Sequence, residues 1–215
     1  MKTLTPVVYV VDDDASMRKA IRNLLESVPL CVESYASPDA FLQSAHLDSP
    51  SCLVLDIRLP EGSGLDFHAD LIRRGIHIPV VFITGYGDIP MSVRAMKAGA
   101  VEFLTKPFRD QELLDAIYRA IGLDRTSRQQ QAELESTRAR YASLTTREQQ
   151  VMALVVAGMS NKQIASEMGI QQATVKFHRG QLIRKMGADS VPDLVRMAER
   201  LGIPRPKSRW SATNG

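Results

Sequence analysis

Short apolar runs alternate with amphipathic segments over the first 121 residues of the chain. The apolar runs cover 7–11, 31–35, 52–55, 79–83 and 101–104. Apolar residues recur at helical spacing over 16–28, 38–47, 64–74, 89–98 and 110–121. Asp14, Ser37 and Asp88 stand where helix N-caps are expected, and Pro38 suits a first helical position. Five alternations predict an α/β domain, a doubly wound parallel sheet with helices on both faces.

Polar residues follow the predicted strands of this domain. The positions are Asp12 and Asp13 after the first run, Asp56 after the third, Thr84 after the fourth and Lys106 after the fifth. In an open parallel sheet, ligands bind outside the carboxyl ends of the strands. Three carboxylates suit a hard divalent cation such as Mg²⁺, and a hydroxyl and an ammonium suit phosphoryl oxygens. The sequence therefore predicts a metal and phosphate site at this edge.

Residues 122–143 have a different composition. The segment GLDRTSRQQQAELESTRARYAS is polar, rich in glutamine and almost free of β-branched residues. Gly122 is placed to end the preceding helix, yet the propensities that follow predict a helical linker, so continuation of that helix stays open. Apolar positions are too sparse for a clear heptad pattern. We expect a solvated helix, with a coiled-coil dimer contact as the alternative.

The segment 144–203 predicts an all-α domain of four short amphipathic helices. Thr145 with Glu148 and Ser160 with Gln163 each fit a capping box. Gly169 stands at the end of the second helix, where a left-handed residue is common. Each helix has one apolar stripe, which is typical of a small bundle around one core.

The second and third helices of this bundle, 160–168 and 171–186, are joined by a short turn. This spacing is typical of a helix-turn-helix. Basic and hydroxyl side chains lie away from the apolar stripe of the third helix, at Thr174, Lys176, His178, Arg179, Arg184 and Lys185. Such side chains suit phosphates and base edges in the major groove. The alternative is a solvated basic face without a nucleic-acid partner.

Charge is distributed unevenly along the chain. Residues 1–121 hold 12 Lys and Arg against 16 Asp and Glu, a net charge of −4, whereas residues 122–215 hold 15 against 8, a net charge of +7. A basic second half favours a polyanionic partner. No apolar run approaches the ~18 residues of a membrane span, so we expect a cytoplasmic protein without a membrane partner. In that compartment Cys31 and Cys52 are expected to be reduced core residues.

Residues 5–121 resemble a receiver domain of two-component signalling, which has a flavodoxin-like fold. The matching stretches are VVDDD, LVLDIRLPEGSGLD, VFITGYGD and MKAGAVEFLTKPF. The resemblance implies that Asp56 accepts a phosphoryl group. It also implies that Mg²⁺ is bound by Asp12, Asp13, Asp56 and the backbone carbonyl of Arg58.

The same resemblance implies roles for the later strand ends. Thr84 and Lys106 would contact the phosphoryl group, and the peptide between Lys106 and Pro107 would be cis. Thr84 and Phe103 would form a switch, in which Phe103 turns inward when the Thr84 hydroxyl binds phosphate. A static core aromatic is the alternative for Phe103.

Residues 144–203 resemble the LuxR-type helix-turn-helix in the stretches LTTREQQV, GMSNKQIA and TVKFHRGQLIRKMG. The resemblance implies that the third helix enters the major groove, with Lys176 and Phe177 near bases and Arg179 or Gly180 one turn further on. Gly180 departs from the longer side chains common at that position. Glu148 is expected to be structural. The implied DNA contacts are Asn161, Lys162, Thr174, Lys176, Phe177, His178, Arg179, Arg184 and Lys185.

Receiver and helix-turn-helix together resemble the FixJ/NarL group of response regulators. This resemblance implies a transcription factor and not an enzyme. A sensor histidine kinase would phosphorylate Asp56, and homodimers would then bind a double-stranded DNA operator, with RNA polymerase as a further candidate partner. The expected domains are a receiver at 1–121, a linker at 122–143, a DNA-binding domain at 144–203 and a disordered tail at 204–215.

Three other functions compete with this one. A phosphorylation-independent regulator would use the receiver-like domain only to dimerise. A Mg²⁺-dependent phosphatase working through an aspartyl phosphate typically needs a second aspartate two residues after Asp56, where this chain has Arg58. A ligand-sensing quorum regulator would need an apolar pocket in place of the acidic cluster.

Overall fold

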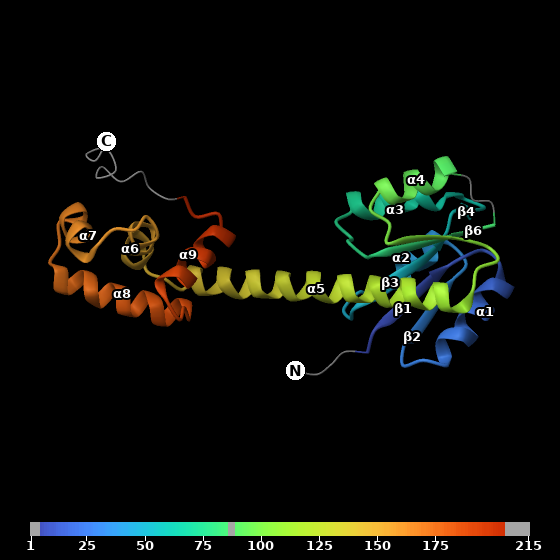
Figure 1. Ribbon diagram of the computed structural model, residues 1–215, viewed down its shortest axis with the longest axis horizontal. Coiled ribbons are helices and arrows are strands. Elements are labelled where there is room, and N and C mark those ends of the chain that lie inside the picture. Colours follow the sequence, from blue (N-terminus) through green and yellow to red (C-terminus); the bar gives the residue numbers. More distant parts are fainter. Residues whose placement is uncertain (1–4, 86–88, 205–215) are drawn as a thin grey trace. The chain divides into compact units, whose positions relative to one another are not determined.

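The chain forms two compact units, Met1–Gln129 and Gln130–Gly215. The computed structural model describes residues 5–85 and 89–204. The predicted cap Asp88 and residues 205–215 of the predicted tail lie outside this range. One long helix, α5 (Asp110–Ala142), begins in the first unit and continues into the second (Figure 1).

The first unit contains a five-stranded parallel sheet in the order β2-β1-β3-β6-β7. Its strands are β1 (Val7–Val11), β2 (Cys31–Tyr35), β3 (Ser51–Asp56), β6 (Val80–Thr84) and β7 (Glu102–Thr105). A small antiparallel hairpin follows β3 and consists of β4 (Arg58–Leu59) and β5 (Gly62–Ser63). The helices before α5 are α1 (Ala15–Glu26), α2 (Pro38–Ser44), α3 (Gly64–Arg73) and α4 (Ile89–Lys97). The predicted doubly wound α/β fold is confirmed.

Helices cover both faces of the sheet, as Figure 1 shows. Successive residues of β1 point to opposite faces, so Val8 packs with α1 and α5 whereas Tyr9 packs with α2, α3 and α4. Residues of β3 alternate in the same way, and all six are buried. Strands that are buried on both sides read as continuous apolar runs, which explains the pattern of the sequence.

The two cysteines are both free, but only Cys52 is buried. The prediction that Cys31 is also a core residue is wrong. Cys31 begins β2, which is an edge strand of the sheet, and its side chain is exposed. An edge strand has a neighbour on one side only, so an apolar run alone does not guarantee burial.

Helix α5 does not end at Gly122, because the helix continues for twenty further residues to Ala142. Asp124 is 4% exposed and accepts hydrogen bonds from the backbone N–H of Ser51 at 2.8 Å and from Nε of Arg128 at 2.6 Å. Arg128 also donates to the carbonyl of Leu47 at 2.8 Å. These contacts fasten the helix beyond Gly122 to the amino-terminal end of β3.

The second unit is the predicted bundle of short helices. Besides the end of α5 it contains α6 (Thr146–Val156), α7 (Asn161–Met168), α8 (Gln172–Met186) and α9 (Val191–Arg200). Both predicted capping boxes are present. Gly169 ends α7 with φ +64°, a conformation that L side chains rarely adopt. Tyr141 and Leu144 pack into the core of this unit, which leaves few apolar side chains for a coiled coil.

None of the helices in 5–85 and 89–204 is both long and apolar enough to cross a bilayer.

Candidate functional site

The carboxyl ends of β1, β3 and β7, which lie at one edge of the sheet, bring together an acidic pocket, defined here as Asp12, Asp13, Asp56 and Lys106. Asp12 and Asp13 follow β1, Asp56 ends β3, and Lys106 follows β7. Carboxylate oxygens of the three aspartates all lie within 4.8 Å of one another. Asp12 is fully buried, Asp56 is 6% exposed and Asp13 is exposed. The pocket therefore has two sheltered carboxylates and one that faces solvent.

Lys106 bridges the two sheltered carboxylates. Its Nζ donates to Oδ2 of Asp12 at 2.7 Å and to Oδ2 of Asp56 at 2.6 Å. The peptide between Lys106 and Pro107 is cis, as the family resemblance implied. The ammonium offsets part of the negative charge, but three carboxylates still face one lysine.

Backbone groups hold the carboxylates in place. Oδ1 of Asp12 accepts the N–H of Asp14 at 2.8 Å, and Oδ1 of Asp56 accepts the N–H of Arg58 at 2.9 Å. Asp14 turns away from the pocket and caps α1 by accepting the N–H of Ser16, as predicted. Each sheltered carboxylate thus has one oxygen fixed by the backbone and the other by Lys106.

Burial and charge act in opposite directions on these groups. Burial raises the pKa of Asp12 above its ordinary value, and the hydrogen bond and charge of Lys106 only partly offset this effect. Burial alone would lower the pKa of Lys106, but its hydrogen bonds to Asp12 and Asp56 raise it overall. The ionised state of Asp12 is therefore costly in the isolated protein, and an added cation would reduce that cost.

The donor set of the pocket fits Mg²⁺. This ion prefers oxygen ligands, usually takes one or two carboxylates, and keeps several waters. Asp12, Asp13 and Asp56 supply carboxylate oxygens, and the exposure of Asp13 leaves a route for a hydrated ion. The backbone carbonyl of Arg58 lies two residues after Asp56, at the start of β4.

The two predicted switch residues lie on neighbouring strands. Thr84 ends β6 and is fully buried, and its carbonyl accepts the N–H of Lys106 at 2.7 Å. Phe103 of β7 is half-buried and packs against the core formed with α2, α3 and α4. Phe82 and Phe103 are register partners in the sheet. The structure places Thr84 at the carboxyl end of β6, between the strands that lead to Asp56 and Lys106, and Phe103 on the adjacent strand β7.

Two contributors to the pocket were not predicted as site residues. Arg18 of α1 donates from one nitrogen to the carbonyls of Asp12, at 2.6 Å, and Asp13, at 2.9 Å. A Cβ at Gly64 would lie 2.2 Å from the carbonyl oxygen of Asp56, so a side chain there would displace the acceptor strand. The glycine-rich stretch after Asp56 is a sequence signal for such a close approach, whereas Arg18 looks like any helix-surface arginine.

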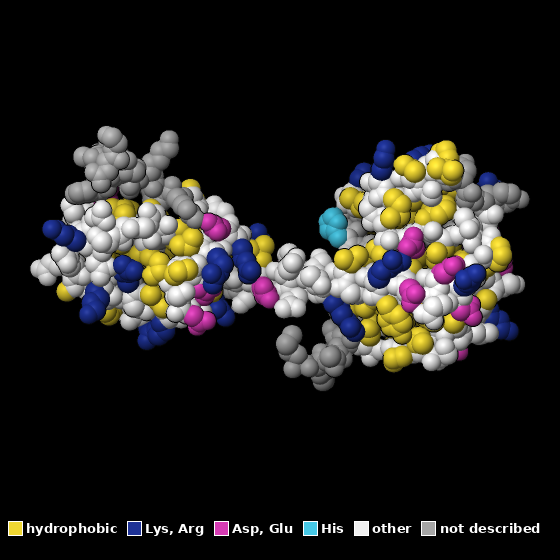
Figure 2. Space-filling model, viewed as in Figure 1, with side chains coloured by type: hydrophobic (Ala, Val, Ile, Leu, Met, Phe, Trp, Pro, Cys, Tyr) yellow, Lys and Arg dark blue, Asp and Glu magenta, His cyan; other side chains and the backbone are white. Residues whose placement is uncertain are grey.

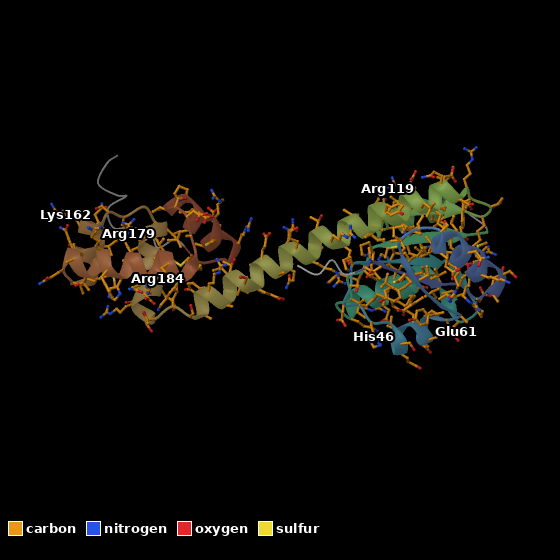
Figure 3. All side chains as sticks on the ribbon, turned by 90° about the horizontal axis from the view of Figure 1, so that it is seen from below. His46, Glu61, Arg119, Lys162, Arg179 and Arg184 are labelled. Carbon is orange, nitrogen blue, oxygen red and sulfur yellow. The ribbon has the colours of Figure 1, made fainter. Side chains whose placement is uncertain are left out.

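In the second unit, α8 is the candidate nucleic-acid-binding element. Thr174, Lys176 and Phe177 are exposed, and His178 is half-buried. Arg179 and Arg184 project from α8, and Lys162 projects from α7 (Figure 3). Lys and Arg side chains are spread over the visible face of this unit, as Figure 2 shows.

Several of the predicted DNA contacts have partners inside the protein. Arg179 donates to Oδ1 of Asn161 at 2.6 Å, and Lys185 donates to Oε2 of Glu148 at 2.7 Å. Arg184 is hydrogen-bonded to the side chain of Gln181. Lys176, in contrast, has no hydrogen-bond or ion-pair partner among residues 5–85 and 89–204. The prediction that Glu148 is structural is confirmed by its salt bridge and capping box.

Both units match known protein families. Residues 8–118 match the family described as response regulator receiver domain, and residues 142–198 match bacterial regulatory proteins of the luxR family. Among curated relatives, Nodulation protein W of Bradyrhizobium diazoefficiens is 53% identical over 92% of this chain and 87% of its own length. Response regulator protein TodT of Pseudomonas putida is 46% identical over 94% and 88%.

Solved structures give the same assignment. The response regulator StyR is 46% identical with a TM-score of 0.83, and the match covers 92% of this chain and all of that one. Full-length FixJ from B. japonicum is 39% identical with a TM-score of 0.55, over 92% and 98%. The acidic pocket at the strand ends and the helix-turn-helix in the second unit agree with these matches. The chain belongs to the response regulator transcription factors that combine a receiver domain with a LuxR-type DNA-binding domain.

Proposed function

We propose that phosphorylation of Asp56 by a sensor histidine kinase controls DNA binding by α8. The observation that carries this proposal is the acidic pocket. Asp56 is held by a backbone N–H on one oxygen and by Lys106 on the other, beside two further carboxylates. Residues that serve only structure rarely gather three carboxylates at one point, because the ionised groups repel one another.

In the proposed transfer, an oxygen of Asp56 forms a bond to phosphorus and the P–N bond of the kinase phosphohistidine breaks. The electron pair of that bond stays on the histidine nitrogen. Bound Mg²⁺, held by Asp12, Asp13, Asp56 and the Arg58 carbonyl, would neutralise negative charge on the phosphoryl oxygens. Lys106, already 2.6 Å from Asp56, would contact the same oxygens. The chain positions the acceptor and compensates charge, which is most of what this chemistry requires.

We infer that the signal leaves the pocket through Thr84 and Phe103. The Thr84 hydroxyl would contact the phosphoryl group, and Phe103 would change its packing on the neighbouring strand. The fully buried Thr84 and the half-buried Phe103 support this order, because the carbonyl of Thr84 binds the backbone of Lys106 whereas Phe103 reaches the surface. This is a local charge change that biases a packing equilibrium.

The surface of α4 supports the proposal that activation forms a homodimer. Ile89, Val93 and Met96 are 80%, 44% and 47% exposed, and their spacing places them on one stripe of the helix. Figure 2 shows apolar side chains gathered over this part of the first unit. The helix follows the segment after Thr84, so a change at Thr84 would act directly on it.

In the second unit, we propose that α8 lies in the major groove of double-stranded DNA. Lys176 and Phe177 would read bases, while the remaining predicted contacts would hold phosphates: Asn161, Lys162, Thr174, His178, Arg179, Arg184 and Lys185. Lys185 would have to share its ammonium between phosphate and Glu148. We also propose RNA polymerase as a second partner and the cytoplasm as the location, since a chromosomal operator would be reached there. The ranges 1–121, 122–143 and 144–203 are our proposal for the limits of the functional domains.

The acceptor role is tested by intact mass. Wild type and Asp56→Asn are incubated with Mg²⁺ and a small-molecule phosphodonor, with Asp66→Asn as a control for an aspartate outside the pocket. We expect one labile phosphoryl group on wild type and Asp66→Asn and none on Asp56→Asn. Equal phosphorylation of all three proteins would show that Asp56 is not the acceptor.

A further inference from the structure

Two unusual residues lie next to each other on the exposed face of α8. Phe177 is 62% exposed. In the described part of the second unit, the other large apolar side chains are buried or half-buried. Gly180 lies one turn further along, and its neighbourhood is open. Residues three apart on a helix are neighbours on its surface, so the ring of Phe177 borders the open position at Gly180.

Nothing among the described residues requires a glycine at position 180. A Cβ there would meet none of their atoms within 4 Å, and the position is exposed in the middle of a regular helix. Glycine at such a place costs roughly a twofold to fivefold loss in helix formation relative to alanine. The open position is therefore explained better by a close approach from outside than by packing within the unit.

Phe177 also has no evident packing role within the described part of the chain. Its only ring contact there is an edge-to-face contact with His178, the next residue, at 5.7 Å between ring centroids. Leaving an aromatic side chain in water is unfavourable, and burying it against a partner recovers that free energy. Among its polar neighbours, Arg179 is bound to Asn161 and Arg184 to Gln181, whereas Lys176 has no partner among the described residues.

We propose that Phe177 and the open position at Gly180 form a contact site for the 5-methyl group of a thymine. This inference rests on the proposed insertion of α8 into the major groove. In that groove the thymine methyl is the apolar feature that distinguishes a T·A pair, and phenylalanine is among the side chains that contact it. The absence of a side chain at Gly180 lets the helix backbone come close enough for the ring to reach the methyl group. Lys176, on the same face, would bind an acceptor on a neighbouring base.

The first test uses DNA that lacks single methyl groups. Duplexes are selected from a random pool with the full-length protein, Mg²⁺ and a small-molecule phosphodonor. Each thymine of the selected site is then replaced by deoxyuridine, which lacks only the methyl group. We expect one position in each half-site at which this change weakens binding about fourfold, the effect of one buried methyl group.

Phe177→Ala should bind the thymine and deoxyuridine duplexes equally, because the contact is lost in both. Should Phe177→Ala lose sequence-specific binding altogether, Phe177→Leu retains an apolar side chain and should keep a reduced preference for thymine. A preference for thymine that persists unchanged in Phe177→Ala would overturn the proposal.

The second test separates the glycine's effect on the helix from its effect on DNA. Gly180→Ala should raise thermal stability and yet weaken binding to the selected duplex about tenfold, because the new methyl group would meet DNA. Gly122→Ala is the matched control, since Gly122 is also exposed within a helix and has open space around it. Gly122→Ala should raise stability without weakening binding.

The results that would contradict the thymine contact differ from those that would contradict the proposed DNA-binding function. Sequence-specific binding that tolerates deoxyuridine at every position, or Gly180→Ala binding as tightly as wild type, would overturn the thymine contact and leave DNA binding intact. Failure to select any duplex, with the protein folded and phosphorylated, would overturn both.

Discussion

Two lysine–carboxylate pairs, one in each unit, have the same geometry and opposite energetics. Lys106 binds Asp12 and Lys185 binds Glu148, each at 2.7 Å. Burial raises the pKa of Asp12 in spite of its lysine. Hydrogen bonds from Lys185 and from the N–H of Thr145 lower the pKa of Glu148, and these outweigh its burial. Ionisation of the carboxyl group is thus harder than usual at Asp12 and easier than usual at Glu148.

The difference lies in what surrounds each carboxylate. Asp12 has a fully buried side chain and shares its lysine with Asp56, while Asp13 adds further negative charge. Glu148 completes a capping box, where the helix N-terminus offers unpaired N–H groups. Around the first pair, negative charge exceeds positive charge, which suits binding of a cationic ligand. In the second pair, the lysine and the helix N-terminus balance the carboxylate, which suits a structural role.

The largest effect on stability is expected at a third ion pair, Asp124 and Arg128, for which we expect a structural role. Asp124→Ala removes a buried acceptor and leaves the N–H of Ser51 without its partner. We expect a loss of about 3 kcal/mol in stability of the first unit, the sum expected for a charged hydrogen bond and an unsatisfied buried donor. Hydrogen exchange in peptides of β3 measures this loss. Arg125→Ala, which alters an exposed side chain of the same helix, should have almost no effect.

Glu148→Ala tests the structural pair of the second unit. It removes the capping box and the partner of Lys185, and should cost about 2 kcal/mol. Hydrogen exchange at the start of α6 provides the measurement. Glu167→Ala, an exposed glutamate on α7, is the control. Equal effects of the two substitutions would remove the distinction between Glu148 and an ordinary surface glutamate.

Asp12→Asn, in contrast to the two preceding substitutions, should increase stability. Without Mg²⁺, it removes a carboxylate whose ionised form is disfavoured by burial, so the first unit should gain about 1 kcal/mol. The same variant should lose affinity for Mg²⁺, measured by calorimetry. A loss of stability as large as that of Glu148→Ala would mean that Asp12 is held for structure.

The smallest effects depend on pH. The folded-state pKa of Asp12 is raised, so the cost of its charge begins to fall as the pH drops through that value and is gone below the ordinary pKa of an aspartate. The advantage of Asp12→Asn should therefore fade there. The folded-state pKa of Glu148 is lowered, so its contribution is complete above the ordinary pKa and is lost only below it. Urea unfolding of wild type and each variant between pH 7 and pH 2 tests both signs.

Much of this contrast was predictable from the sequence. Asp12, Asp13, Asp56, Thr84 and Lys106 each follow an apolar run, and parallel strands bring such ends to one edge. The capping box at Thr145 and Glu148 depends on residues three apart and is equally local. In both cases a short-range pattern specifies the geometry.

Other features depend on contacts between distant segments and were missed or mistaken. The sequence left open whether the helix ends at Gly122, and the answer depends on Asp124 and Arg128, which bind residues more than seventy positions away and hold the helix beyond it. The exposure of Cys31 follows from the order of strands, which its own run does not specify. The partners of Arg179 and Lys185 likewise come from other helices. The sequence alone therefore does not distinguish these internally bonded residues from Lys176.

The central claim is that phosphate on Asp56 controls DNA binding, and one measurement tests it most directly. Affinity for a selected duplex is measured for wild type and Asp56→Asn, with Mg²⁺, before and after a small-molecule phosphodonor, at fixed salt. We expect wild type to bind about tenfold tighter after phosphorylation, a usual coupling between two sites, and Asp56→Asn to stay unchanged. An equal gain in both proteins, or no gain in wild type shown by mass to be phosphorylated, would contradict the claim.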